Sequence, residues 1–169
     1  MLHRIKSFAF VILGFFIVIT LFSLLMPSTA VVVRSETIPS TRADILKQIQ
    51  QPEAWLNWYP PLKDTSTVPS VQGDTIRWNS SNHKNILFIE KKHREGIRAS
   101  FTRSGELPVL YDITVFEIDG LPQVEWKAIH KLPWYPWEKF AGIFLDDLAG
   151  QGYAIALVQL KEWVQSGKE

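Results

Sequence analysis

The end of the chain constrains the fold most, because residues 134–166 carry a helix-compatible pattern with two neighbouring apolar stripes. One stripe is Phe144, Leu148, Ile155 and Val158, and the other is Ala149, Tyr153, Ala156, Leu160 and Val164. Residues three or four apart share a helix face, so this helix is apolar over an unusually broad arc. Such a helix favours a concave partner over a flat one. The interior glycines Gly150 and Gly152 predict a kink or break near Gly150.

The residues before this helix follow a period of two, which predicts antiparallel strands. Alternation is clearest in Val109, Tyr111, Ile113 and Val115, and again in Val124, Trp126, Ala128 and His130. Turn signals separate the strands at residues 79–82, 94–96 and 119–120, with Gly96 expected at positive φ. Together with a strand over residues 31–38, they predict a curved antiparallel sheet of six to seven strands.

Two short helices are predicted between the first strand and this meander. Thr41 is a good N-cap for the first, and Pro52 stops it. A second helical turn carries Trp55 and Trp58 before the next prolines. The order of elements predicts an α+β helix-grip fold, in which the sheet wraps the long C-terminal helix and encloses a cavity.

The N-terminal segment Ser7 to Met26 contains 20 residues without a charge. As a helix it would be roughly 30 Å long, which matches the hydrocarbon core of a bilayer. We predict a membrane anchor over residues 1–29 and a folded domain over residues 30–169. A cleaved signal peptide, giving a chain that begins at Val31, is the alternative. Basic residues before the span favour a cytoplasmic N-terminus and an extracytoplasmic domain, periplasmic in a Gram-negative cell.

Composition excludes several classes of site. The chain has no cysteine, so disulfides and thiolate metal sites are absent. Of the 18 basic residues, Arg4 and Lys6 precede the span; the remaining 16 face 17 acidic residues, a net charge of −1. A near-neutral domain lacks the basic surface that binds nucleic acid. The histidines show no metal-ligand spacing, so we predict no metal and no cofactor.

Several pieces of the sequence resemble the START-like, polyketide-cyclase/dehydrase superfamily (SRPBCC), especially bacterial members with an N-terminal membrane span. They are Arg34-Ser35 leading to Ile38, residues 55–60 (WLNWYP), residues 135–140 (YPWEKF), Leu145-Asp146 and Leu160-Lys161. The resemblance covers nearly everything from Val31 to Val164. It implies a helix-grip fold around a hydrophobic cavity that holds lipids, sterols, polyketides or hormones in relatives, and it implies no catalytic motif. Glu36 departs from the pattern, since an apolar strand residue is expected there; if it points inward, Arg34 is its expected partner.

Aromatic residues beside prolines suit the rim of a cavity, where one side of a ring is apolar and the other is wet. We predict eight residues in the cavity wall or rim: Trp58, Trp78, Phe101, Tyr111, Trp126, His130, Phe144 and Leu148. His130 is the one candidate for acid–base catalysis, and a hydrogen-bonded wall histidine is the simpler interpretation.

The expected function is therefore a membrane-anchored, non-catalytic domain that binds a hydrophobic small molecule or lipid between the sheet and the C-terminal helix. Two alternatives remain open. One is a cyclase- or dehydrase-type enzyme that uses the same cavity with His130. The other is an interaction module with a filled core, whose aromatic loops bind another membrane protein.

Overall fold

The computed structural model describes residues 2–63 and 65–167, so Met1, Asp64 and residues 168–169 of the two predicted domains lie outside it. The helices are α1 (Leu2–Leu25), α2 (Arg42–Gln50), η1 (Pro52–Ala54), α3 (Trp55–Trp58), η2 (Pro60–Leu62), α4 (Pro136–Ala141), η3 (Gly142–Phe144) and α5 (Leu145–Gln165). The strands are β1 (Thr29–Thr37), β2 (Ser70–Gln72), β3 (Thr75–Ser80), β4 (His83–His93), β5 (Gly96–Arg103), β6 (Val109–Ile118) and β7 (Leu121–Lys131).

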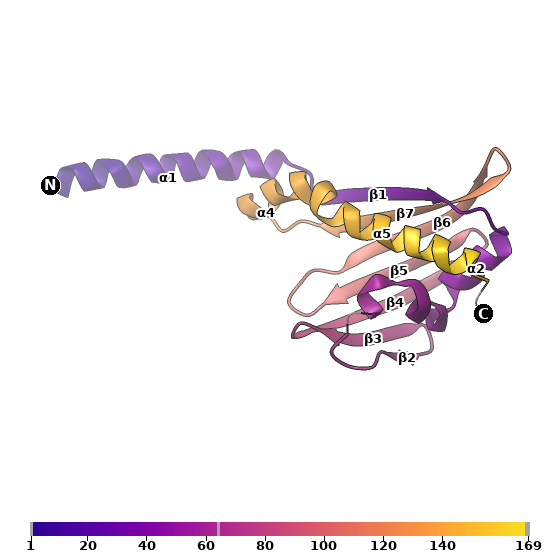
Figure 1. The fold of residues 1–169 in the computed structure, drawn as a ribbon. Helices are drawn as coiled ribbons and strands as arrows, with labels where there is room; N and C mark the ends of the chain where they lie inside the picture. Colours follow the sequence, from indigo (N-terminus) through magenta and orange to yellow (C-terminus); the bar gives the residue numbers. More distant parts are fainter. Residues whose placement is uncertain (1, 64, 168–169) are drawn as a thin grey trace.

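Within the described residues, seven strands form one antiparallel sheet in the order β1-β7-β6-β5-β4-β3-β2. The strands from β2 to β7 follow one another as a meander, and β1 joins the far edge by pairing with β7 along its whole length. The sheet curves beneath α5 and the short helices, which lie together on one face (Figure 1). This arrangement confirms the predicted α+β helix-grip fold.

The two short helices form as predicted, for local reasons. The side chain of Thr41 accepts a hydrogen bond from the backbone N–H of Asp44, which satisfies one of the free donors at the start of α2. Pro52 follows shortly after the last residue of α2 and begins η1. Ile45 and Ile49 of α2 are fully buried, so this helix covers one end of the concave face.

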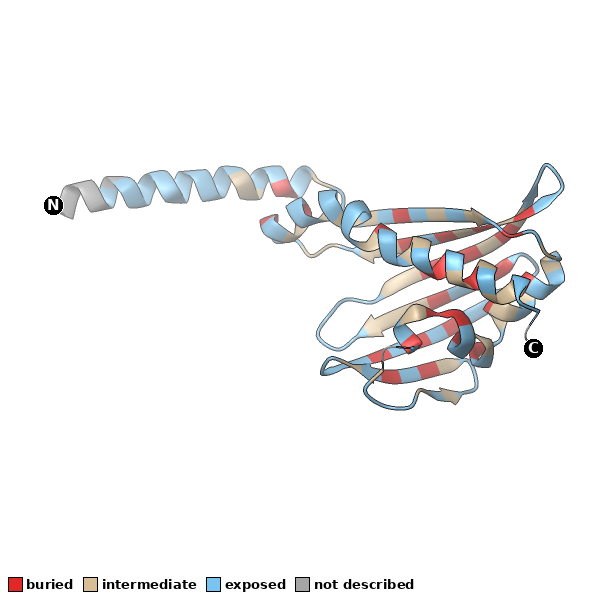
Figure 2. Cartoon of the chain, in the orientation of Figure 1, coloured by how far each residue is buried: buried red, intermediate tan, exposed pale blue. Residues whose placement is uncertain are grey.

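Burial alternates along the strands, so one face of the sheet is packed and the other meets solvent (Figure 2). On β7 the inward side chains are Val124, Trp126 and Ala128, with His130 following on the same face. The period of two therefore placed these residues correctly.

The apolar face of α5 is less completely covered than its breadth led us to expect. Ala156 and Leu160 of the second stripe are fully buried against the sheet. In the first stripe, Leu148 is 75% exposed and Ile155 is 53% exposed. The sheet covers the second stripe more completely than the first, because α5 lies along β1 at one margin of the sheet.

The predicted break near Gly150 was also wrong. The chain bends earlier, through η3, and α5 continues without interruption past Gly150. Gly150 has a packing role, because a Cβ there would lie 1.9 Å from Nη2 of Arg34. Arg34 crosses the helix at this point and donates to both carboxylate oxygens of Asp146, at 2.8 and 3.0 Å. This ion pair raises the pKa of Arg34 and lowers that of Asp146.

Arg34 is therefore not the partner of Glu36, as the sequence suggested. Glu36 instead accepts a hydrogen bond from Nζ of Lys161 on α5. Both side chains are about one-third exposed, so the pair lies at the margin of the sheet–helix interface, where a carboxylate is tolerated.

Gly96 is required by close packing, and its backbone lies outside the positive-φ region that we expected. A Cβ at Gly96 would lie 1.9 Å from the carbonyl oxygen of Ile113 on the neighbouring strand β6. Positive φ occurs instead at Ser81, Asn82 and Asp119, the last followed by Gly120, in two other hairpin turns of the sheet.

Within the part of the chain that the structure describes, two helical stretches are apolar and long enough to cross a membrane, and they differ in their surroundings. The window Phe8–Leu25 of α1 is almost entirely exposed and projects away from the domain (Figures 1 and 2). The second stretch, Pro136–Gln165, includes α5, whose inner face packs on the sheet as the core helix of the domain.

Candidate functional site

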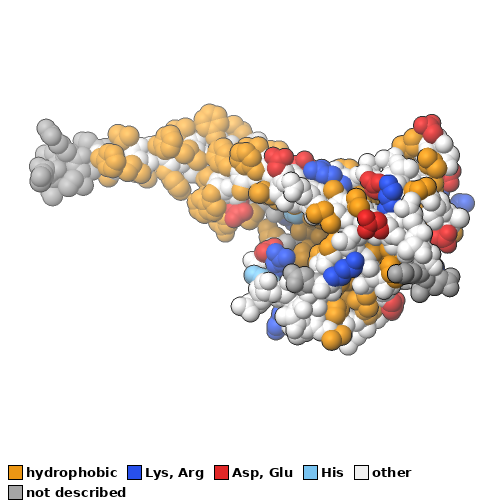
Figure 3. Space-filling view, in the orientation of Figure 1, with side chains coloured by type: hydrophobic (Ala, Val, Ile, Leu, Met, Phe, Trp, Pro, Cys, Tyr) orange, Lys and Arg blue, Asp and Glu red, His pale blue; other side chains and the backbone are white. Residues whose placement is uncertain are grey.

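A cavity of about 1000 Å³ lies between the concave face of the sheet and α5. The sheet contributes Trp78, Ser80, Asn85, Phe101, Arg103, Val109, His130 and Lys131 to its lining. The helices and adjoining segments contribute Tyr59, Pro60, Pro61, Leu132, Pro133, Tyr135, Glu138, Leu145, Leu148, Ala149, Gly152, Tyr153 and Ile155, and the β5–β6 loop contributes Gly105, Glu106 and Leu107. The cavity opens to the surface, which is hollowed between the start of α5 and the β3–β4 hairpin (Figure 3).

A row of aromatic rings forms the sheet side of the cavity. Trp78 of β3 stacks on Phe101 of β5 with ring centroids 5.9 Å apart, and Phe101 stacks on Tyr111 of β6 at 6.0 Å. Tyr111 in turn meets the ring of Tyr153 on α5, edge to face, at 5.7 Å. Contacting aromatic rings hold one another in place, so this wall is rigid and largely apolar.

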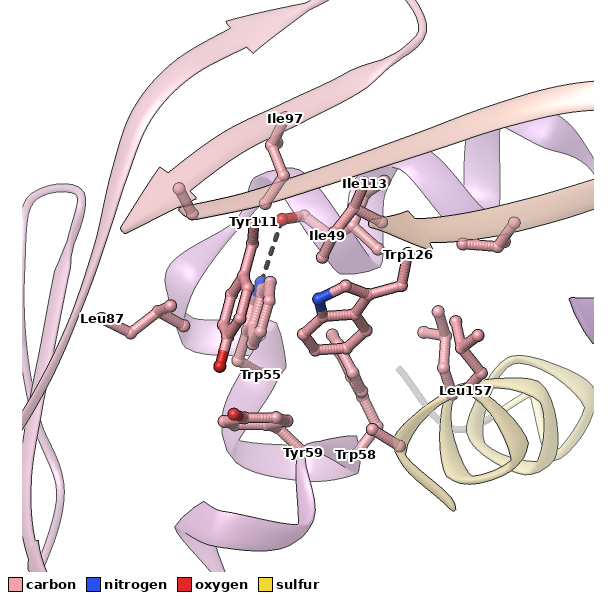
Figure 4. Close-up of a cluster of buried hydrophobic side chains, with 14 of the residues drawn as sticks. Ile49, Trp55, Trp58, Tyr59, Leu87, Ile97, Tyr111, Ile113, Trp126 and Leu157 are labelled. Atoms are coloured by element: carbon pink, nitrogen blue, oxygen red, sulfur yellow. Dashed lines mark hydrogen bonds between the residues drawn. The ribbon is translucent and has the colours of Figure 1, made fainter. Parts of the chain in front are cut away.

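A buried cluster of tryptophans packs against Tyr59, which lines the cavity (Figure 4). Trp55 and Trp58 of α3 are fully buried, with ring centroids 4.6 Å apart, and both contact Trp126 of β7. Trp55 donates its indole N–H to the carbonyl of Ile49, and Trp58 donates to that of Gln48. The indole N–H of Trp126 has no partner among the described residues. The α3 turn therefore fills one end of the concave face of the sheet.

A polar pair lies where β7 meets α5 at the cavity wall. Nε2 of His130 lies 3.1 Å from the hydroxyl of Tyr153. Partial burial lowers the pKa of His130, which favours the neutral imidazole at pH 7. Burial raises the pKa of Tyr153, as it does for Tyr59 and Tyr111 nearby, so these hydroxyls stay protonated and can donate to a ligand.

A second polar group lies on the opposite side of the mouth. Asn85 is buried on β4, and its side-chain oxygen accepts a hydrogen bond from Nε of Arg103 at 3.3 Å. Nη1 of Arg103 lies 3.6 Å from a carboxylate oxygen of Glu106 in the β5–β6 loop. The cavity thus has an apolar interior and two polar edges, an arrangement that suits an amphipathic molecule.

The structure brings together four of the eight residues predicted in the wall, since Trp78, Phe101, His130 and Leu148 all line the cavity. Tyr111 is buried behind them in the aromatic row. Whether any of them contacts a ligand stays a prediction.

The other three predicted wall residues lie elsewhere. Trp58 and Trp126 belong to the buried tryptophan cluster, because the α3 turn folds onto the sheet and fills the space beside Trp126. Phe144 is 60% exposed and lies outside the cavity, because η3 turns the chain before α5 begins.

Several lining residues were missed by the sequence interpretation. Arg103 lies two positions after Phe101 on the same face of β5, so strand alternation could have identified it. Tyr153 was assigned to the packed stripe of α5 without a role in the cavity. Asn85 gave no usable signal, because a polar residue on an inward strand face is an exception to the apolar pattern.

Nothing among residues 2–63 and 65–167 groups three or more His, Cys, Asp or Glu side chains as a metal site would require. His130 faces the cavity with a hydroxyl partner, while the carboxylate of Glu106 is paired with Arg103 across the mouth. Among the described residues that line the cavity, His130 is the histidine, and Glu106 and Glu138 are the carboxylates that could take part in acid–base chemistry.

No family model matches the sequence, and no curated protein matches it. Solved structures do match it. An uncharacterised protein from Bacillus thuringiensis superposes with a TM-score of 0.61 at 16% identity, over 80% of this chain and 99% of the other. A START superfamily protein from Mycobacterium smegmatis superposes with a TM-score of 0.60 at 11% identity, over 82% and 99%. A protein of the dynemicin biosynthetic locus gives 0.58 at 12% identity, over 82% of this chain and 48% of the other.

At these identities the likeness concerns the fold. The chain has the START-like, SRPBCC fold, as the resemblance of its sequence segments implied. The solved structures match about four-fifths of the chain.

Proposed function

We propose that this protein is a membrane-anchored binding domain for a hydrophobic small molecule or lipid, without catalytic activity of its own. The observation that carries the proposal is the open cavity of about 1000 Å³ between the aromatic row of the sheet and α5. A volume of this size is at the upper end of the range for small-molecule sites. The similarity to a START superfamily protein, whose fold this chain shares, adds support.

The expected binding energy follows from the apolar lining. A ligand that buries about 300 Å² of apolar surface gains about 7.5 kcal/mol at roughly 25 cal/mol per Å², before the entropic cost of association. The polar pair of His130 and Tyr153 would orient one polar end of the ligand, and Arg103 with Asn85 would hold an acceptor at the other edge. We therefore expect a long or bulky apolar molecule with a small polar group.

Membrane anchoring through residues 1–29 belongs to the same proposal, with the N-terminus cytoplasmic and the domain of residues 30–169 extracytoplasmic. Retention of the span is supported by Lys139, which is buried in α4. Its ammonium donates to the carbonyl of Pro27 and to Oγ of Ser28, both at 2.9 Å. A signal-peptide cleavage that leaves Val31 as the first residue would remove both acceptors and leave a buried charge unpaired.

The test uses Gly152, which lines the cavity. A Cβ added at this position would meet no atom within 4 Å, so a side chain can be introduced there. The full-length wild-type protein is purified from native membranes in mild detergent, and bound lipids and small molecules are identified by mass spectrometry. In Gly152→Phe the phenyl ring occupies the cavity, while the control Gly152→Ala removes the same helical glycine and leaves the space open.

We expect wild type and Gly152→Ala to retain the same ligand and Gly152→Phe to lose it. Neither substitution is expected to lower the stability, because glycine within a helix costs about 1 kcal/mol relative to alanine. A wild-type protein that carries no ligand, or a Gly152→Phe variant that retains it, would contradict the proposal.

An enzyme of the cyclase or dehydrase type is the second candidate, and the contact between His130 and Tyr153 at the cavity wall favours it. Such an enzyme would convert the ligand recovered from native membranes into a product, and His130→Gln would abolish the conversion without abolishing binding. Ligand that is recovered unchanged after incubation with the wild-type protein would argue against catalysis. A filled-core interaction module is disfavoured by the size of the cavity.

A further inference from the structure

Exposed side chains between β7 and α5 are all apolar or aromatic. Over residues 132–145, each of which the structure describes, the exposed residues are Trp134, Tyr135, Trp137, Phe140, Ala141, Ile143 and Phe144. The two charged residues of this stretch are withdrawn from solvent, since Glu138 is partly buried and Lys139 is buried. We call the six large side chains Trp134, Tyr135, Trp137, Phe140, Ile143 and Phe144 the collar.

The collar is an exposed surface of apolar and aromatic side chains. Trp134 and Trp137 are 62% and 60% exposed, and both contact the ring of Tyr135, with centroids 4.9 and 5.3 Å away. Large contiguous apolar patches are uncommon on soluble surfaces and mark contacts with a membrane or a partner. Trp and Tyr, in particular, are enriched where a protein meets the headgroup region of a bilayer.

The position of the collar relative to α1 indicates which surface covers it. Helix α4 lies beside the last turns of α1 (Figure 1), and the two helices are in contact. Lys139 stabilises the contact between α4 and α1, because its ammonium donates a hydrogen bond to the carbonyl of Pro27, two residues after the apolar window that ends at Leu25. Hydrophobic side chains cover α1 and continue onto this neighbouring region (Figure 3).

The length of α1 then sets the depth of the collar. The window Phe8–Leu25 spans about 27 Å at 1.5 Å per residue, close to the thickness of roughly 30 Å of a hydrocarbon core. If α1 crosses the bilayer, its last turns lie at the boundary between acyl chains and headgroups. Because Lys139 holds α4 at the end of α1, the collar lies at the same level.

We propose that the collar inserts into the interfacial region of the same bilayer that α1 spans, so that the domain lies against the membrane surface. Tyr135 belongs to the collar and also lines the cavity, and Leu132 and Leu145 line it on either side. An apolar ligand therefore exchanges between the outer part of the bilayer and the cavity without crossing bulk water. This route deepens the proposed function and rests on it, whereas insertion of the collar does not require a ligand.

The absence of native cysteine makes the test direct. Single cysteines replace Ile143 and Phe144 in the collar, both 60% exposed, so that neither substitution disturbs the core. Ile12→Cys reports a position inside the span, four residues from its Phe8 end. Val158→Cys is the matched control, since Val158 is also an exposed apolar residue of the α4–α5 region but lies about 21 Å further along α5 from Phe144 at 1.5 Å per residue. Each full-length variant carries a nitroxide spin label in phosphatidylcholine vesicles.

Collision with oxygen, which concentrates in lipid, is compared with collision with a water-soluble nickel chelate. We expect the label at residue 12 to lie within the hydrocarbon and the label at residue 158 to lie in water. The labels at residues 143 and 144 should lie at a shallow depth, several-fold less accessible to the chelate than the label at residue 158. Collar labels as accessible to the chelate as the control would overturn the proposal, and so would a water-exposed label at residue 12. Spin–spin broadening at the collar that vanishes on dilution with unlabelled protein would show that a second copy of the protein covers the collar. That result would also overturn the proposal.

The outcome is separable from that of the proposed function. The labelling experiment measures depth and needs no bound molecule, while the Gly152 variants leave every collar residue intact. A membrane-inserted collar on a protein without ligand would refute the binding function alone.

Discussion

The substitution Gly96→Ala should be the most destabilising glycine-to-alanine change in the domain. The new methyl group would lie 1.9 Å from the carbonyl oxygen of Ile113 and 2.9 Å from its carbonyl carbon, whereas ordinary contacts begin at 3.4 Å. Both atoms belong to the backbone of β6, so no side-chain rotation relieves the clash. The strands β5 and β6 would have to separate by about 1.5 Å at this point, which a close-packed interior resists.

The magnitude follows from what this separation breaks. Overpacking of this kind costs about 1–3 kcal/mol. Two hydrogen bonds at the same point add about 1 kcal/mol each: the N–H of Val115 donates to Glu95 at 2.7 Å, and the side chain of Gln50 donates to the Gly96 carbonyl at 3.3 Å. A loss of about 3–5 kcal/mol lowers the melting temperature by about 10–15 °C in a chain of this size.

Thermal unfolding of the full-length protein in detergent, followed by circular dichroism, measures this change. Gly105→Ala is the control, because it alters the unfolded chain in the same way but meets nothing within 4 Å. Its φ of +87° makes alanine strained there, at a cost of about 1–2 kcal/mol. A melting temperature for Gly96→Ala equal to that of Gly105→Ala would refute the argument from close approach.

Three further outcomes follow from charged and buried groups. Gly150→Ala should displace Arg34 and raise the pKa of Asp146 toward its ordinary value, measured by carboxyl NMR titration; an unchanged pKa would show that Arg34 accommodates the methyl group. Because burial lowers the pKa of His130, the unfolded chain binds that proton at higher pH than the folded one. Stability should therefore fall as pH drops below about 6.5, and His130→Gln should flatten the profile in denaturant unfolding. Burial raises the pKa of Tyr59, so its ionisation stabilises the unfolded state above pH ~10. Ultraviolet absorbance should therefore show tyrosinate from this residue only when the protein unfolds. Loss of that absorbance signal in Tyr59→Phe would assign it to Tyr59.

Much of the fold was determined by local pattern. Alternation along β6 and β7 identified the buried face, and Thr41 and Pro52 marked the limits of α2, because caps, prolines and strand periods act within a few residues of themselves. The apolar segment Ser7 to Met26 is likewise helical as far as Leu25, as part of the single helix α1. These features depend on short-range geometry, which the order of residues records directly.

The cavity depended on how distant segments meet. Trp58 and Trp126 were predicted in the wall or rim of the cavity, yet the α3 turn packs onto β7 and buries both beside one another. Gly150 was predicted to break the helix, yet it is where Arg34 crosses from β1. Residue type and spacing do not show which distant segment of the chain packs against a given residue.

The N-terminal strand, α2, the meander from β3 to β7 and the inward faces of β6 and β7 could thus be predicted from the chain alone, because they follow from periodicity and from the chemistry of single residues. Which apolar residues the sheet covers, which line open space and which remain exposed beside α1 emerged only on folding. Burial is a relation between two surfaces, and folding is what brings those surfaces together.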